Sequence, residues 1–472
     1  MNKQFFKSVG VLVGGTAGAQ LTMLLAAPIL TRLYTPADFG ILAIYTSLLA
    51  IFSIVANLRY EVAIPLPHYK VVAVNLAAVA SLIAMIVSLF SLCVIYLFIQ
   101  LLSDKLNASH ITIFLWFLPL AILLTGLQQV LSNFSVREKQ FKMLSSSRVF
   151  LGLVTVSIQL AAFSFEVLGL LLGQIIGLLV STLFLAVAVL RMEMIKAVSP
   201  FRMLSVVRRY SRFPKFSVWD GLSNTAGTNL PTVLIVSSFG ASAGGIYSMT
   251  LRVLVFPVTL IGAAVGQVFL SDAPQAHREN RLSQLVLRLT EIMLGLSLPF
   301  MFLAFLFGPE VFALIFGNAW RESGEFAKWL SPWIILTFVY SPLSSVFSVL
   351  KLEKTVMKLQ FIFLILRLGV IFIGISAGDL LTTVILFGIL NFIYYFFLIC
   401  RVLSLLQISL YNFLIGKFTQ LAILSFIALL TWYYSDQFTG HELYRLCLIL
   451  LSIVLAYFYI KKTTIIINTI NA

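Results

Sequence analysis

VVAVNLAAVASLIAMIVSLFSLCVIYLFI, residues 71–99, carries no charged side chain over a length that can cross a bilayer. About 20 apolar residues are enough for a helix to span roughly 30 Å of hydrocarbon. Such a run must be helical in lipid, because each backbone N–H and C=O needs a partner within its own segment. Similar runs recur along the chain, whereas a transmembrane β-barrel would show short alternating strands. The sequence therefore predicts an all-α integral membrane protein.

The composition agrees with this fold class. Of the 472 residues, 60% are hydrophobic and 10% are charged, whereas a soluble domain carries about 25% charged residues. Too few charges remain to cover a water-facing surface. The net charge of +15 could suggest nucleic acid, but in a membrane protein it more often reflects basic cytoplasmic loops. We therefore expect no nucleic-acid partner.

Fourteen apolar runs are long enough to be transmembrane helices. They cover residues 10–30, 39–58, 71–99, 111–133, 147–165, 167–190, 217–238, 244–270, 284–307, 328–350, 359–377, 379–400, 418–434 and 445–460. With the N-terminus inside, 25 of the 32 Lys and Arg residues fall on the cytoplasmic side and five fall outside. The positive-inside rule therefore predicts an even number of spans with both termini in the cytoplasm.

A long basic segment, residues 191–216, separates the first six spans from the next six. Because six is even, two six-helix bundles would share one orientation and form a parallel repeat. Gly40 and Gly245 support this, since each opens the second span of its half after a short outer turn. We predict an N-terminal six-helix bundle at 1–198, a cytoplasmic amphipathic linker at 199–216, a C-terminal six-helix bundle at 217–400, and a cytoplasmic connection with helices 13 and 14 at 401–472.

The linker itself predicts a short helix. Ser199 followed by Pro200 is typical of a helix start. Phe201, Leu204 and Val207 would then share one face. Four arginines lie opposite them: Arg202, Arg208, Arg209 and Arg212. This pattern indicates a helix lying in the membrane interface, either as a linker anchored by snorkelling arginines or as a regulatory site.

Four ionisable residues inside predicted spans are candidate site residues: Asp220, Arg252, Glu291 and Arg367. Each costs about 2.5–3.5 kcal/mol at mid-helix, so each should face protein or water. A guanidinium keeps its charge and suits bidentate binding of phosphate, so Arg252 and Arg367 are candidate substrate-binding residues. The alternative is an ion pair or a carbonyl clamp between helices. Asp220 and Glu291 are candidate ion-coupling residues, or acids that reach the nearby cytoplasmic face.

Polar and small residues gather in the first span of each half. Residues 217–229 and 14–22 are both rich in Ser, Thr, Asn, Gln and Gly. Their matching positions favour a water-filled cleft, with Asn224, Asn229 and Gln20 as substrate-binding candidates. The alternative is close helix packing through the small residues.

No catalytic set is present. The four histidines are scattered, and no DxD, HExxH, GxSxG or phosphate-loop pattern occurs. The three cysteines have no disulfide or metal spacing. We therefore predict a transporter without catalytic residues, metal or cofactor. Without a nucleotide-binding domain, transport would depend on gradients or membrane potential.

Several stretches resemble polysaccharide-export flippases. Residues 31–40 (TRLYTPADFG) resemble the first outer loop of these proteins, and residues 58–67 (LRYEVAIPLP) resemble their first cytoplasmic loop. Residues 209–214 (RYSRFP) are similar to the entry to span seven. Other similar stretches are 245–247, 252–254, 266–269, 316–320 and 341–344. The resemblance covers about residues 5–360, and the later spans resemble the family only in hydropathy.

The resemblance implies the O-antigen flippase branch, often called Wzx, of the multidrug/oligosaccharidyl-lipid/polysaccharide exporter superfamily. Such proteins move undecaprenyl-diphosphate-linked oligosaccharides from the cytoplasmic to the periplasmic leaflet of the bacterial inner membrane by alternating access. The implied partners are the lipid-linked oligosaccharide, membrane lipid, a polysaccharide polymerase and a chain-length regulator.

Two other functions stay open. One is a drug or peptidoglycan-precursor (lipid II) exporter of the same superfamily. The other is a membrane glycosyltransferase or polymerase, which would need a large outer loop or an acidic metal site. The longest outer loop, near residues 308–327, is too short for a domain.

Overall fold

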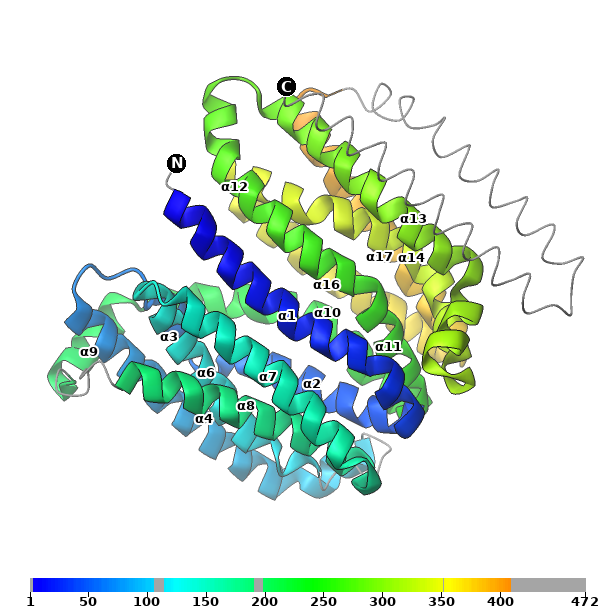
Figure 1. Cartoon of the computed structure of the whole chain (residues 1–472), viewed down its shortest axis with the longest axis horizontal. Coiled ribbons are helices and arrows are strands. Elements are labelled where there is room, and N and C mark those ends of the chain that lie inside the picture. Colours follow the sequence, from blue (N-terminus) through cyan, green and yellow to red (C-terminus); the bar gives the residue numbers. More distant parts are fainter. Residues whose placement is uncertain (1–2, 106–113, 191–197, 351, 409–472) are drawn as a thin grey trace, which may run out of the picture. The chain divides into compact units, whose positions relative to one another are not determined.

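The computed structural model describes residues 3–105, 114–190, 198–350 and 352–408 (Figure 1). Helices make up these ranges almost entirely, and no strand is present in them. Ten of the described helical stretches are long and apolar enough to cross a membrane. The prediction of an all-α membrane protein is therefore confirmed.

The ten stretches coincide with ten of the fourteen predicted spans. Two further helices, α1 (Lys3–Leu33) and α10 (Val218–Phe239), form at the predicted spans 10–30 and 217–238. The last two predicted spans, 418–434 and 445–460, lie outside the described residues. The count of fourteen and the division into two six-helix bundles thus stay predictions.

The chain divides into two compact units. Unit 1 comprises Met1–Met249 and Gln360–Ile371, and unit 2 comprises Thr250–Leu359 and Phe372–Ala472. The boundaries cut two helices, α11 (Ala241–Pro257) and α16 (Glu353–Ser376). The sequence instead predicts a division at the linker 199–216, between two six-helix repeats. That division stays a prediction.

Unit 1 contains the N-terminal helices and α10. In chain order its helices are α1, α2 (Pro36–Ala56), α3 (Tyr60–Ala63), α4 (Lys70–Lys105), α6 (Leu118–Arg137), α7 (Phe141–Ala161), η1 (Phe163–Phe165), α8 (Val167–Leu190), α9 (Pro200–Arg209), η3 (Phe213–Ser217) and α10. Helix α7 packs against both α1 and α8, and α2 packs against α6 and α10.

Small residues bring α1 and α7 together. A Cβ on Gly15 would lie 2.6 Å from the Cα atom of Ser145, and one on Gly152 would lie 3.0 Å from the carbonyl oxygen of Ala19. In contrast, no atom lies within 4 Å of a Cβ built on Gly14. One side of α1 therefore serves close packing, as one of the two interpretations of its composition predicted.

The starts of α2 and α11 cross at two glycines in unit 1. A Cβ on Gly40 would lie 1.7 Å from the carbonyl oxygen of Ala241, and one on Gly245 would lie 1.8 Å from that of Pro36. Pro36 and Ala241 are the first residues of the two helices. The contact is therefore reciprocal, and it joins the two glycines that the sequence predicts to be equivalent.

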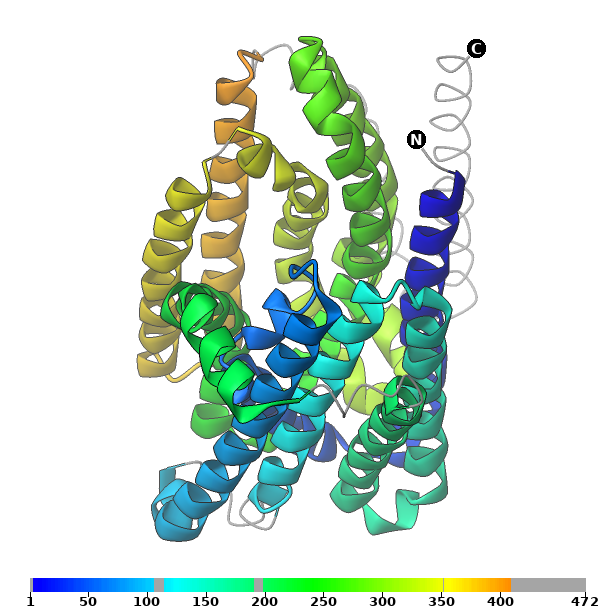
Figure 2. The same cartoon turned by 90° about the vertical axis from the view of Figure 1, so that its left-hand side faces the viewer.

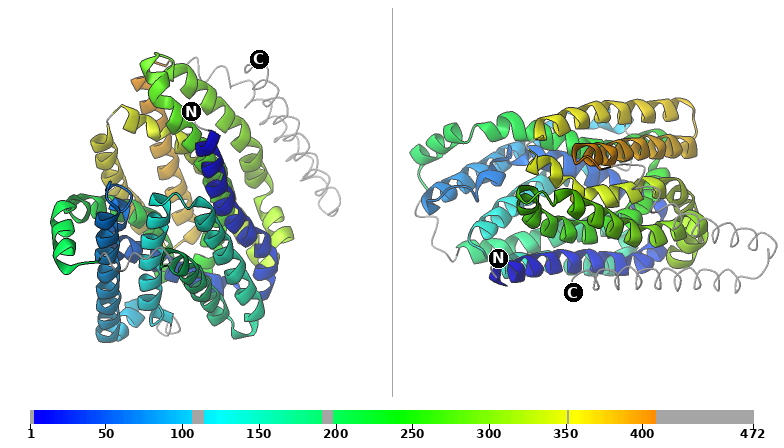
Figure 3. Two further views of the ribbon diagram at one scale, coloured as in Figure 1. Left: turned by 60° about the vertical axis from the view of Figure 1, so that its left-hand side comes forward. Right: turned by 90° about the horizontal axis from the view of Figure 1, so that it is seen from above.

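Unit 2 is built on α13 (Leu282–Phe316) and α14 (Arg321–Leu343), which lie side by side (Figure 3). Figure 2 shows α17 (Leu380–Leu405), in orange, beside α14. The unit also contains η4 (Val258–Gly262), α12 (Ala263–Arg278), η5 (Asn318–Trp320) and α15 (Ser345–Val349). The hydroxyl of Thr250 donates to the carbonyl oxygen of Ser323 at 2.9 Å and ties the second part of α11 to α14.

Candidate functional site

Helix α10 carries three of the predicted site residues. Asp220 is exposed in its first turn, and Asn224 is exposed one turn later. Asn229 is half-buried, and its amide nitrogen donates to the carbonyl oxygen of Thr225 at 2.9 Å and to the hydroxyl of Thr228 at 3.1 Å. The amide N–H groups of Asn229 are therefore used within the helix.

Pro231 interrupts the hydrogen bonding of the same helix. A proline has no N–H, so it cannot donate to the carbonyl four residues earlier. That carbonyl belongs to Gly227, and it accepts a hydrogen bond from Nη1 of Arg367 on α16 at 3.2 Å. A Cβ on residue 227 would lie 3.1 Å from this nitrogen, so glycine leaves room for the guanidinium.

Arg367 is held on a second side by an aromatic ring. Its side chain is buried, with 7% of the residue exposed, and its Cζ atom lies 4.2 Å from the ring centroid of Phe363 on the preceding turn. A guanidinium over an aromatic face is attracted by the ring quadrupole. Arg367 thus forms the carbonyl clamp between helices that the sequence left open beside substrate binding.

Arg252 lies in a different environment. It is exposed on α11, although Thr250 and Leu254, two residues to either side, are buried in unit 2. Its guanidinium is therefore accessible to a ligand. Glu291, on α13 of the same unit, is also exposed. Gln20 is half-buried on α1 of unit 1.

The structure thus places Asp220, Asn224 and Asn229 on α10 and joins Arg367 of α16 to the same helix at Gly227, all in unit 1. Gln20 belongs to the same unit, whereas Arg252 and Glu291 belong to unit 2. No group of three or more metal-ligating side chains is present in the described part of the chain.

Arg148 stands at the cytoplasmic start of the predicted span 147–165 and was counted among the cytoplasmic cations. In the structure it lies inside α7, in a helical stretch apolar enough to span the membrane. Its Nη1 atom donates to the hydroxyl of Thr16 on α1, one turn before Gln20. Because α7 starts at Phe141 instead of residue 147, Arg148 lies two turns inside the helix and not at its first turn.

Glu61 is the second residue that sequence reasoning missed. It lies in α3, between two spans, and only 3% of it is exposed. Its Oε1 atom lies 3.7 Å from Nη1 of Arg59, and its Oε2 atom has no hydrogen-bond partner among the described residues. Burial raises the pKa of the Glu61 carboxyl from 4.5 to about 7, although the charge of Arg59 opposes this.

The loop before α3 connects this acid to the start of α10. Leu58 and Arg59 adopt left-handed backbone angles, with φ of 46° and 62°. The guanidinium of Arg59 packs on α10, where a Cβ on Gly221 would lie 3.3 Å from its Cζ atom. The signal in the sequence was a single acid in an otherwise apolar loop, directly after Arg59-Tyr60.

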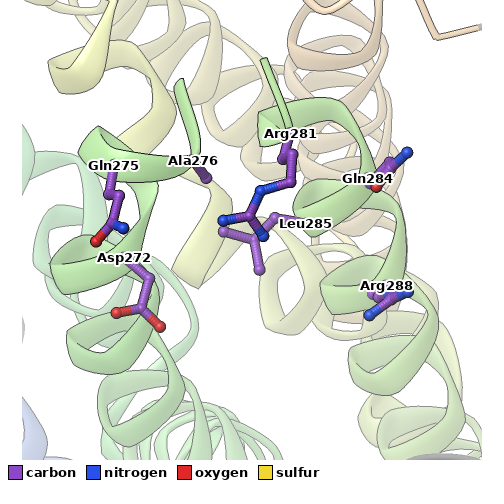
Figure 4. A pocket seen from close by; sticks show the side chains of 7 residues that line it. All are labelled: Asp272, Gln275, Ala276, Arg281, Gln284, Leu285 and Arg288. Carbon is purple, nitrogen blue, oxygen red and sulfur yellow. The ribbon is translucent and has the colours of Figure 1, made fainter. Parts of the chain in front are cut away.

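A separate pocket lies in unit 2 between α12 and α13 (Figure 4). It has a volume of about 220 Å³ and is lined by Asp272, Gln275, Ala276, Arg281, Gln284, Leu285 and Arg288. Arg281 pairs with the adjacent Glu279. None of the predicted site residues lines this pocket.

The described helices, with polar and ionisable groups placed among apolar spans, define a multi-pass α-helical membrane protein. A model of the family described as polysaccharide biosynthesis protein matches residues 29–325. This is more than half of the chain, which therefore belongs to the polysaccharide biosynthesis protein family. The predicted resemblance to the polysaccharide branch is confirmed.

Solved structures show the same fold. The chain is similar to a lipid II flippase, MurJ, in an inward closed conformation, with a TM-score of 0.68 and 14% identity over 99% of this chain and 98% of that one. It is also similar to an inward-facing multidrug resistance MATE family transporter of the MOP superfamily, with a TM-score of 0.59 and 15% identity over 84% and 94% of the two chains. The chain therefore shares its fold with these two transporters.

A curated relative matches part of the chain. The succinoglycan biosynthesis transport protein ExoT of Rhizobium meliloti (strain 1021) is 25% identical over 334 residues. The match covers 67% of this chain and 64% of the length of that protein.

The buried acid predicts a pH-dependent stability. Because the pKa of Glu61 is raised from 4.5 to about 7, the folded protein retains a proton that the unfolded chain loses between these values. Stability should therefore fall as pH rises across this interval and level off above it. Glu61→Gln should remove this dependence and stabilise the protein at pH ~8 by on the order of 3 kcal/mol. Melting temperatures of the purified protein at acidic and alkaline pH measure the effect.

Glu322→Gln is the control for this prediction, because Glu322 is an exposed glutamate at the start of α14. It should melt in parallel with the native protein at every pH. A Glu61→Gln profile that also runs parallel to the native one would show that the carboxylate is ionised in the folded state.

Proposed function

We propose that this protein is a flippase for an undecaprenyl-diphosphate-linked oligosaccharide, such as an O-antigen or another surface polysaccharide repeat unit. It would move this lipid from the cytoplasmic to the periplasmic leaflet of a bacterial inner membrane by alternating access, with both of its termini in the cytoplasm. Membership of the polysaccharide biosynthesis family together with the MOP transporter fold supports this proposal. The observation that supports binding of an anionic lipid is Arg252, an accessible permanent cation in an apolar span.

In this proposal Arg252 binds the diphosphate. A diphosphate presents pairs of oxygens, and a guanidinium can donate to two of them at once. Asn224, Asn229 and Gln20 bind sugar hydroxyls, which both donate and accept hydrogen bonds. Since the amide N–H groups of Asn229 are used within α10, its Oδ1 atom is the one we assign to a hydroxyl. Weak polar contacts suit a carrier that must release its substrate.

We assign Arg367 the role of a positioning residue for Asn224 and Asn229. It supports the carbonyl that Pro231 leaves without a donor, and this support holds the stretch of α10 that carries Asn224 and Asn229. Its effect on substrate binding would then pass through α10. The alternative is direct contact between the guanidinium of Arg367 and the substrate. The double-variant experiment below distinguishes this alternative from an effect through α10.

The driving force is proposed to involve Asp220 and Glu291. Proton coupling needs an acid whose surroundings change with the conformation of the protein. Asp220 is the stronger candidate, because it opens α10 next to the polar residues of the site and is exposed in this structure. Closure around it would remove water and favour its protonated form.

The MOP fold also accommodates the second function, export of a drug or of lipid II, since a MATE transporter and a lipid II flippase share it. Deletion of the gene separates these functions. A polysaccharide flippase predicts loss of surface polysaccharide, whereas a drug exporter predicts loss of drug resistance and a lipid II exporter predicts loss of cell-wall synthesis. The proposed protein partners are a polysaccharide polymerase and a chain-length regulator. A function of another class, as a membrane glycosyltransferase or polymerase, is the alternative to transport.

Arg252→Ala should abolish surface polysaccharide and leave the amount of protein in the membrane unchanged, because the anionic diphosphate loses its cation. Arg252→Lys should restore transport only in part, since lysine cannot bind two oxygens in a planar fork. Polysaccharide immunoblots beside quantified protein levels measure both effects. A residual activity that simply follows a reduced protein level would assign Arg252 to folding instead.

Asp220→Asn should uncouple transport from an imposed pH gradient while still permitting substrate binding, because asparagine cannot take up a proton. Glu291→Gln should have a smaller effect. Flux in proteoliposomes with and without the gradient measures the coupling. An Asp220→Asn variant with unchanged dependence on the gradient would leave the acid as a residue favoured by the dipole of the α10 N-terminus.

Arg367→Ala should destabilise the protein by about 1–3 kcal/mol, because the Gly227 carbonyl loses its donor. Pro231→Ala supplies an N–H within the helix, so the double variant Pro231→Ala/Arg367→Ala should recover this loss. Melting temperature measures stability, and surface polysaccharide measures transport. If Arg367 acts through α10, the double variant regains both. Regained stability without transport would show direct contact between the guanidinium and the substrate.

A further inference from the structure

Helix α9 is fixed to the rest of unit 1 on one side. Val206 is buried, with 5% exposed, in a cluster that includes Tyr60 and Ile64. The hydroxyl of Tyr60 donates to the carbonyl oxygen of Val207 at 3.3 Å. The backbone N–H of Ser199, just before the helix, donates to Oδ1 of Asn75 on α4 at 2.9 Å. Helix α9 therefore has a defined inner face against α3 and α4 (Figure 1).

The opposite side of α9 is apolar as well. Phe201 is 83% exposed and Leu204 is 54% exposed. Phe216 and Trp219, at the entry to α10, are 69% and 66% exposed. The sequence predicted one apolar face of Phe201, Leu204 and Val207. In the structure Val207 packs with the inner cluster instead, so Phe201 and Leu204 form a second apolar side that unit 1 does not use.

Cations accompany these exposed apolar residues. Five exposed basic side chains lie on α9 and in the segment between α9 and α10: Arg202, Arg208, Arg209, Arg212 and Lys215. The sequence has no Asp or Glu from residue 198 to residue 219. Within the described residues, none of the five forms an ion pair.

The helical period sets how the two kinds of side chain alternate on α9. Phe201, Leu204 and Arg208 follow at spacings of three and four residues, so they share one stripe. Arg202 and Arg209 are seven residues apart and form a neighbouring stripe. Phe201, Leu204 and Arg208 thus lie opposite the buried Val206. Arg202 and Arg209, four and three residues from Val206, lie at the edge between the apolar stripe and the buried face.

We infer that α9 and the turn leading to α10 bind the headgroups of anionic phospholipids. The partner must offer an apolar layer and a layer of negative charge next to each other, and a membrane surface that contains such lipids offers both. Phe201 and Leu204 would enter the boundary of the acyl layer while the five cations contact lipid phosphates. The surrounding spans place lipid within reach. The inference does not depend on which substrate the protein carries.

Such binding would reach the proposed substrate site through the backbone. Arg212 directly precedes the π-helical segment Phe213–Ser217, which contains Lys215 and leads directly into α10. Helix α10 then carries Asp220, Asn224 and Asn229. Lipid bound at α9 would therefore restrain the entry to the helix that holds the site residues.

Hydrogen exchange of the full chain in nanodiscs tests the inference. Amides of Phe201–Arg209 should exchange several-fold more slowly in nanodiscs with phosphatidylglycerol than in pure phosphatidylcholine, and added salt should reduce the difference because it screens exposed charges. Equal exchange in the two lipids would overturn the inference.

Native mass spectrometry provides the matched comparison. Arg208→Gln/Arg209→Gln/Arg212→Gln should retain several-fold less phosphatidylglycerol than the native protein. Lys142→Gln/Arg278→Gln/Arg401→Gln removes the same charge from exposed residues on α7, α12 and α17, and it should retain lipid like the native protein. Arg208→Lys/Arg209→Lys/Arg212→Lys keeps the charges and should also bind. Equal losses in the two glutamine variants, or retained lipid in the first, would overturn the proposal.

Discussion

The hydrogen bond from Arg367 to the Gly227 carbonyl is the interaction on which the arrangement of the candidate site depends. In a bilayer no water can satisfy a backbone group, so a proline in a span leaves a carbonyl that needs another donor. Pro231 creates this need, and Arg367, 140 positions away in sequence from Gly227, meets it. Arg367 lies within Gln360–Ile371, which belongs to unit 1 although the flanking parts of the chain belong to unit 2. The buried Arg367 thus has a structural role, because it donates to a backbone carbonyl that has no donor within its own helix.

A second constraint acts at the other end of α10, where α11 starts. Gly40 and Gly245 permit backbone contact between the first turns of α2 and α11, with no room for a Cβ on either. Gly240, with φ of 90°, forms the turn that separates α10 from α11. These contacts fix where α11 begins, and Arg252 follows Gly245 by seven residues on the same side of the helix. Helix crossing at small residues is the usual means of close approach in membranes.

Hydropathy and loop charge predict ten described spans because both follow from the bilayer alone. The family was predicted from the resemblance of short sequence stretches. The environment of single charged residues was harder to predict. Arg367 was foreseen as a clamp only as one of two alternatives, since its donor role depends on Pro231 of a distant helix. The burial of Glu61 could not be read from a loop position, because it results from the left-handed turn at Leu58 and Arg59. Likewise Val207 points inward only because α9 docks on α3 and α4.

Three arginines in or near spans show why residue type alone does not assign a role. Arg367 is buried and donates to a carbonyl, Arg148 is half-buried and donates to the hydroxyl of Thr16, and Arg252 is exposed. A cation already engaged by the protein has less of its hydrogen-bonding capacity left for a ligand, whereas an accessible one can exchange water for phosphate. By this criterion Arg252 is the residue best suited to bind and release an anionic headgroup. The two engaged arginines are better suited to hold neighbouring helices together, α7 to α1 through Arg148 and α16 to α10 through Arg367.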